Sequence, residues 1–92
     1  MKGTYIIPAV GQTYRNRDGG EYLCTDTRLY ENDAQKQRAV SLGEHVAWFK
    51  RVKDGWTLAA HGVIQYEDGT IEWQKFKFVS LSAMQIPANR LH

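Results

Sequence analysis

The feature that most constrains this chain is the pair Asp68-Gly69, which lies between two runs rich in apolar residues. Asp-Gly supplies the positive φ angles that a tight β-hairpin needs, so the pair predicts a two-residue loop between antiparallel strands. In that register Tyr66 faces Ile71 and Ile64 faces Trp73, which places four large apolar side chains on one face. The spacing therefore predicts a hairpin that contributes to the core.

Three further glycine-centred turn signals, at residues 18–20, 42–44 and 53–55, predict a meander of short antiparallel strands. Taken as a three-residue loop with a glycine bulge, residues 53–55 continue the same apolar face. The expected core face then consists of Val46, Trp48, Val52, Trp56, Leu58, Ala60, Ile64, Tyr66, Ile71 and Trp73. A one-residue slip in either hairpin would turn the aromatic residues to the other face.

The remaining segments carry weaker signals. Residues 12–14 and 21–25 flank a turn and predict a first hairpin. Residues 30–38 are polar without an apolar stripe, so we expect a long loop or a single helical turn. Residues 80–86 suit a last strand or a short helix. We expect one domain of 92 residues in the all-β class with at most one short helix, forming a small antiparallel sheet or a half-closed barrel of the Src-homology type.

Size and composition bound the function. A chain of 92 residues supports one core, and 42% hydrophobic residues are too many for a disordered chain. A formal net charge of +2 gives no strong electrostatic steering. The lone Cys24 excludes an internal disulfide and favours a reducing, cytoplasmic location. The apolar run near the N-terminus is too short for a signal peptide, and we expect no membrane span.

Catalytic and metal-binding patterns are weak. The three histidines, His45, His61 and His92, lack ligand spacing, and Cys24 has no neighbouring cysteine. The sequence contains no nucleophile elbow, phosphate-binding loop or dinucleotide fingerprint. We therefore expect a non-enzymatic protein that needs no cofactor or metal, with a small enzyme as the least favoured alternative.

Two surfaces are candidates for binding. The reverse face of the central hairpin carries Phe49, Ala59, His61 and Val63, which is more apolar than a solvated face should be. Together with Tyr30, an aromatic residue outside the central hairpins, this face predicts a contact surface for a protein partner or for a homodimer.

The alternative ligand is a nucleic acid. Basic residues cluster near one turn and alternate with Phe76 and Phe78 further on, a pattern that suits a stacking platform with phosphate contacts. The candidate residues are Lys50, Arg51, Lys53, Lys75 and Lys77. The same pattern also fits two core phenylalanines with lysines that keep an edge strand from pairing.

Four sequence blocks carry a resemblance: residues 13–16, 20–24, 55–62 and 66–73, the last two reading GWTLAAHG and YEDGTIEW. In these blocks the chain resembles small proteins of phages and mobile elements in Gram-positive gut bacteria, a group without an established activity. The resemblance implies an accessory protein that binds a host or phage factor. Residues 30–38 and the segment after Lys75 depart from the pattern, so a function located there is not implied.

Overall fold

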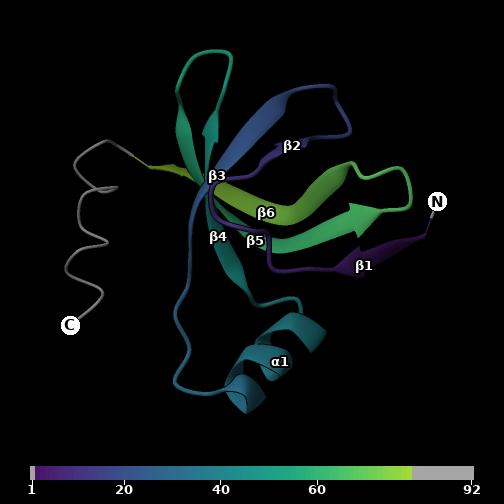
Figure 1. The fold of residues 1–92 in the computed structure, drawn as a ribbon, viewed down its shortest axis with the longest axis vertical. Coiled ribbons are helices and arrows are strands. Elements are labelled where there is room, and N and C mark those ends of the chain that lie inside the picture. The colour runs from purple at the N-terminus through teal and green to yellow at the C-terminus, as the bar shows by residue number, and fades with distance from the viewer. Residues whose placement is uncertain (1, 80–92) are drawn as a thin grey trace.

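The computed structural model describes residues 2–79 and shows a six-stranded antiparallel sheet with one short helix (Figure 1). The elements in chain order are β1 (Gly3–Tyr5), β2 (Thr13–Arg15), β3 (Glu21–Thr27), α1 (Asp33–Ser41), β4 (Val46–Arg51), β5 (Thr57–Tyr66) and β6 (Ile71–Val79). The predicted all-β class and the first hairpin, β2 with β3, are confirmed. Residues 80–86, expected as a strand or helix, lie outside the described residues.

The sheet is organised around β5, its longest strand. β6 pairs along one side of β5, whereas β4 and β1 share the other side, and β3 and β2 follow β4 outward. A single bridge between Asn16 and Ile71 then joins the end of β2 to the start of β6, where the Arg17 N–H donates to the Ile71 carbonyl at 3.2 Å. The sheet is therefore curled so that its two edges meet at one point. The Src-homology likeness stays a prediction.

The core lies inside this curl and is centred on Phe49, whose side chain is fully buried. Its ring centroid lies 6.3 Å from Tyr14, 6.4 Å from Tyr22 and 5.6 Å from Trp73. Burying a phenylalanine side chain stabilises a fold by about 1.5–3 kcal/mol, so this residue is a main contributor. The buried apolar set is Tyr14, Tyr22, Cys24, Ala47, Phe49, Leu58, Ala60, Val63 and Ile71.

The loop at Asp68-Gly69 is one residue longer than expected. The Tyr66 N–H donates to the Thr70 carbonyl at 2.9 Å, so residues 67–69 form a three-residue loop. Ile71 consequently pairs with Gln65, and Trp73 pairs with Val63. The expected pairs of Tyr66 with Ile71 and of Ile64 with Trp73 are wrong, because Gly69 alone takes the positive φ and ends the loop.

The loop between β4 and β5 is also one residue longer. Arg51 pairs with Trp56 through an N–H to carbonyl bond of 2.7 Å, which leaves residues 52–55 in the loop. Phe49 then lies opposite Leu58 and takes the core position expected for Trp48. The prediction that Val52 and Trp56 belong to the core is wrong, since both side chains are more than half exposed.

A face reversal within β5 explains the remaining errors. Leu58 and Ala60 point into the core as expected, but after Gly62 the buried residue is Val63. Gly62 has a φ of +69°, which breaks the ordinary alternation of a strand. Ile64 and Tyr66 are therefore only half-buried, whereas Val46 and Trp48 on β4 are half-buried because of the longer loop before β5.

Residues 33–41 form a nine-residue helix, not the expected loop or single turn. Asn32 caps it, because its Oδ1 accepts the Gln35 N–H at 2.9 Å. None of the helix side chains is buried, which agrees with the missing apolar stripe. Figure 1 shows α1 at one end of the sheet, beyond the start of β4. Among residues 2–79 no helix has the length and apolar character needed to cross a membrane.

Candidate functional site: a basic face of the sheet

The outer face of β4, β5 and β6 combines aromatic and basic side chains. Trp48 pairs with Ala59, and Ala59 pairs with Lys77 on the next strand. One row along, His61 pairs with both Val46 and Lys75. Cross-strand partners project from the same face of a sheet, so these side chains share one surface, opposite to the core.

Two more basic residues extend this surface. Lys50 pairs with Thr57 in the row on the other side of Trp48. The N–H of Arg28 donates to the Val46 carbonyl at 3.1 Å and continues the row of His61 toward β3. We call this surface the basic face and define it by Arg28, Val46, Trp48, Lys50, Thr57, Ala59, His61, Lys75 and Lys77.

The basic face concentrates the positive charge of the chain. Its four cations, Arg28, Lys50, Lys75 and Lys77, have two carboxylates near them: Asp26 pairs with Trp48, and Glu44 lines a pocket together with Arg28. The resulting formal charge of +2 equals that of the entire chain, so the charges of the remaining residues cancel. Across residues 2–79, no carboxylate forms an ion pair with Lys50, Lys75 or Lys77. All three lysines are exposed.

His61 and Trp48 lie between the lysines and are both half-buried. Burial, and secondarily the charge of Lys75, lowers the pKa of His61 from its ordinary value of 6.5. The imidazole is therefore mainly neutral at pH 7. A neutral imidazole beside an indole offers flat surface for stacking, with the cations arranged around it.

The sequence predicts two sets of binding residues, one for a protein partner and one for nucleic acid. The structure brings only part of each set together. Ala59 and His61, expected to contact a protein, lie on the basic face together with three of the expected nucleic-acid contacts. Tyr30 lies close to this face, because the guanidinium of Arg28 stacks over its ring at 5.9 Å. Phe49 and Val63 do not belong here: both are fully buried in the core, owing to the longer loop and to Gly62.

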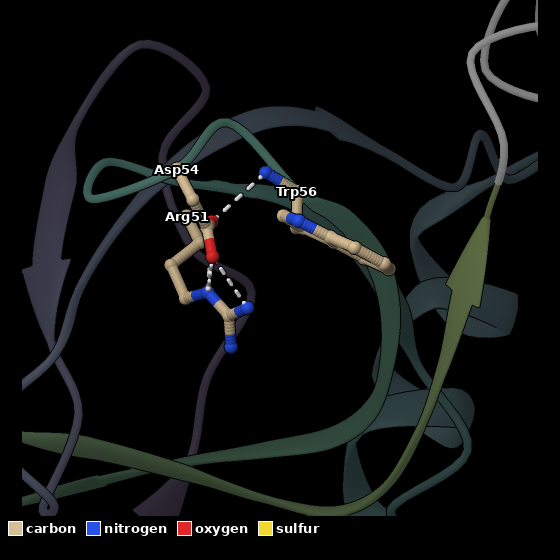
Figure 2. Close-up of polar contacts among 3 residues, drawn as sticks. All are labelled: Arg51, Asp54 and Trp56. Atoms are coloured by element: carbon tan, nitrogen blue, oxygen red, sulfur yellow. Dashed lines mark hydrogen bonds and ion pairs between the residues drawn. The ribbon is translucent and has the colours of Figure 1, made fainter.

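Arg51 and Lys53 are separated from the other basic residues. The guanidinium of Arg51 donates to the carboxylate of Asp54 through bonds of 2.7, 2.9 and 3.1 Å, and the N–H of Trp56 donates to the same carboxylate (Figure 2). This pairing lowers the pKa of Asp54 and raises that of Arg51. Lys53 is exposed within the same turn. Arg51 therefore stabilises the turn and Lys53 lies exposed on it, so neither residue extends the basic face.

Trp48 is a residue of the candidate site that sequence reasoning missed, as is Arg28. The three-residue loop assigned to residues 53–55 placed Trp48 in the core. The signal that could have found Trp48 is the alternation Trp48, Lys50, which puts an aromatic and a cation on one side of a strand.

Two of the side chains considered for catalysis, Cys24 and His45, are buried in the core. No group of three potential metal ligands comes together among residues 2–79. Cys24 is fully buried, and this burial raises the pKa of its thiol to about 11. His45 is also buried and donates from Nε2 to the carbonyl of Val63 at 3.0 Å. Its role is to tie two segments of the core together.

A second surface contains exposed aromatic side chains. Trp56, Phe76 and Phe78 are 56%, 51% and 43% exposed, and the ring centroids of Trp56 and Phe76 each lie 5.3 Å from that of Phe78. Beside them is a cleft of about 310 Å³, which we call the aromatic cleft. Its lining residues are Asn16, Asp18, Tyr22, Arg51, Leu58, Glu72, Trp73, Phe76 and Phe78.

No protein-family model, no curated protein and no solved structure matches this chain.

Proposed function

We propose that this protein binds single-stranded nucleic acid on the basic face. The observation that carries the proposal is the arrangement of Lys50, Lys75 and Lys77 around Trp48, on one surface and without carboxylate partners among the described residues. This is the combination that sequence-tolerant binding of single strands requires: cations for the phosphates and a flat ring for a base.

The single strand is favoured over the duplex because of Trp48. A base can stack on an indole only when it is free of its own neighbours in a helix, and such stacking contributes about 1–3 kcal/mol per base. The lysines contribute through release of counterions, which makes binding weaken as salt is added. The proposed activity is binding alone and involves no covalent step.

Protection of a sheet edge against pairing with other chains is an alternative role for the lysines, but it explains their arrangement less well. Lysines on an edge strand prevent pairing with other chains, and this reading suits Lys75 and Lys77 on β6. It does not suit Lys50, because β4 lies between β3 and β5 and has no free edge along these residues. The position of Lys50 therefore favours a shared ligand for the three lysines.

The test is the affinity for a fluorescent single-stranded oligothymidylate, measured by anisotropy at several salt concentrations. The triple variant Lys50→Gln, Lys75→Gln, Lys77→Gln should bind at least tenfold more weakly at low salt. Since each phosphate contact on a single strand contributes about −0.7 to the slope of log affinity against log salt, the slope should fall in magnitude by about 2.

A matched triple variant, Lys2→Gln, Lys36→Gln, Lys53→Gln, removes the same charge from exposed positions outside the basic face. It should retain most of the affinity. Trp48→Leu should weaken binding without changing the salt slope, because it removes stacking alone. Equal losses in the two triple variants, or no binding by the unmodified chain at low salt, would refute the proposal.

A further inference from the structure

The aromatic cleft lies where the curled sheet remains open. The bridge from Asn16 to Ile71 joins the sheet edges at the start of β6 only. Farther along, Phe76 and Phe78 pair with Ala60 and Leu58, and so point to the core side of the sheet. They are nevertheless about half exposed, which is unusual for large apolar side chains in that orientation. The cleft thus presents core-facing aromatic rings to solvent.

The rim of the cleft is acidic. Asp18 uses Oδ1 to accept the N–H of Gly20 at 2.8 Å, and Glu72 uses Oε1 to accept the hydroxyl of Tyr66 at 2.5 Å. The cation that lines the cleft, Arg51, has its charge matched by Asp54, as Figure 2 shows. With the neighbouring Arg17 counted, which lies over the ring of Tyr66, the carboxylates of Asp18 and Glu72 leave the cleft with a formal charge of −1, in contrast to the basic face.

Aromatic rings in this region already accept guanidinium groups of the chain itself. The Cζ of Arg51 lies 5.7 Å from the ring centroid of Phe78. Nearby, the Cζ of Arg17 lies 4.5 Å from the ring centroid of Tyr66. Both distances are within the range in which a cation is attracted by the electrons of an aromatic face.

We propose that the aromatic cleft binds the cationic end of an arginine side chain from a partner protein. The rings of Trp73, Phe76 and Phe78 supply the aromatic walls, and Asp18 and Glu72 supply the opposite charge at the rim. A nucleic acid is disfavoured, because its phosphates would meet those two carboxylates. This site is separate from the basic face and does not depend on the proposed function.

The experiment uses the full chain labelled with ¹⁵N, titrated with acetyl-arginine amide and, separately, with acetyl-citrulline amide. Citrulline has nearly the shape of arginine but carries no charge. The indole N–H signals of Trp56 and Trp73 should shift saturably with the arginine compound at millimolar concentration. The affinity for the citrulline compound should be at least fivefold lower.

Two variants locate the site. Glu72→Gln keeps an acceptor for Tyr66 but removes the charge, and Phe78→Leu removes one ring; each should weaken arginine binding at least threefold. Glu67→Gln removes the same charge from the exposed loop outside the cleft and should leave binding unchanged.

Three results would overturn the proposal. The first is the absence of saturable shifts with the arginine compound, and the second is equal binding of the citrulline compound. The third is a shift of the same indole signals by oligothymidylate or by raising the concentration of the protein alone. The last would assign the cleft to nucleic acid or to a second copy of the chain.

Discussion

The backbone of Gly62 packs against the backbone of Gly43, so closely that a Cβ atom at Gly62 would lie 2.9 Å from the Gly43 carbonyl oxygen. The N–H of Gly62 also donates to the carbonyl of His45 at 2.9 Å. These contacts join the segment after α1 to the middle of β5. They fix the point at which β5 exchanges one buried face for the other.

Replacing Gly62 with alanine should destabilise the fold. The positive φ of +69° alone costs an L-residue about 1–3 kcal/mol, and the contact with Gly43 adds a clash with backbone that cannot move aside easily. Urea unfolding followed by tryptophan fluorescence measures the loss. Gly69→Ala is the control, since its φ is +86° but nothing lies within 4 Å of the added carbon. Equal losses in the two variants would show that the contact with Gly43 is unimportant.

The same glycine marks how far the sequence could predict the fold. Glycine-centred turns revealed the hairpins and hence the all-β class, because those signals are local. The expected loops are one residue too short in both central hairpins. Asp-Gly suits a two-residue loop and also the end of a three-residue loop, and Gly55 ends a four-residue loop where three residues are expected. Nothing in the sequence around Gly62 distinguishes a face reversal from an ordinary strand.

These small errors had large effects on the candidate site. A one-residue shift exchanges the two faces of a strand. Phe49 therefore lies in the core and Trp48 on the surface, the reverse of the arrangement that the expected register predicts. The lysines were identified from sequence alone, because basic residues are exposed in almost any register. Their grouping with Trp48 and His61 depends on pairing across three strands, which only the structure provides.

The assignment of Phe49 to the core can be tested by truncation. Phe49→Ala should lower the free energy of unfolding by about 3–5 kcal/mol, because it leaves a cavity among Tyr14, Tyr22 and Trp73. Phe78→Ala, at a position 43% exposed, should cost clearly less. Urea denaturation of both variants provides the comparison. If Phe49 were a contact residue on the surface, its truncation would cost no more than that of Phe78.

The thiol of Cys24 should be unreactive in the folded protein. Burial raises its pKa to about 11, so the thiolate that attacks disulfide reagents is scarce at pH 8. Native protein mixed with Ellman's reagent should release thionitrobenzoate at least a hundredfold more slowly than protein in about 6 M guanidinium chloride. The denaturant unfolds the chain and so exposes the thiol. Rapid labelling of the native chain would show that the core around Cys24 opens readily.

His61 should make the stability of the protein depend on pH. Its ring faces Val46 from β4 and the ammonium of Lys75 from β6, and burial together with that charge lowers its pKa below 6.5. The unfolded chain therefore takes up the proton more readily than the folded chain. The contribution of His61 to the free energy of unfolding is complete above pH 6.5, and it is lost as the pH falls from 6.5 through the pKa of the folded state.

Urea unfolding of the unmodified chain and of His61→Gln between pH 8 and pH 5 isolates this contribution. The variant should lose less stability than the unmodified chain as the pH falls below 6.5, and parallel curves would contradict the assignment.

A phosphate bound near Lys75 would favour the protonated ring of His61 and so raise its pKa again. Oligothymidylate should therefore bind more tightly at pH 5.5 than at pH 7.5, and this gain should be smaller in His61→Gln, which links the titration of one histidine to the ligand proposed for the basic face.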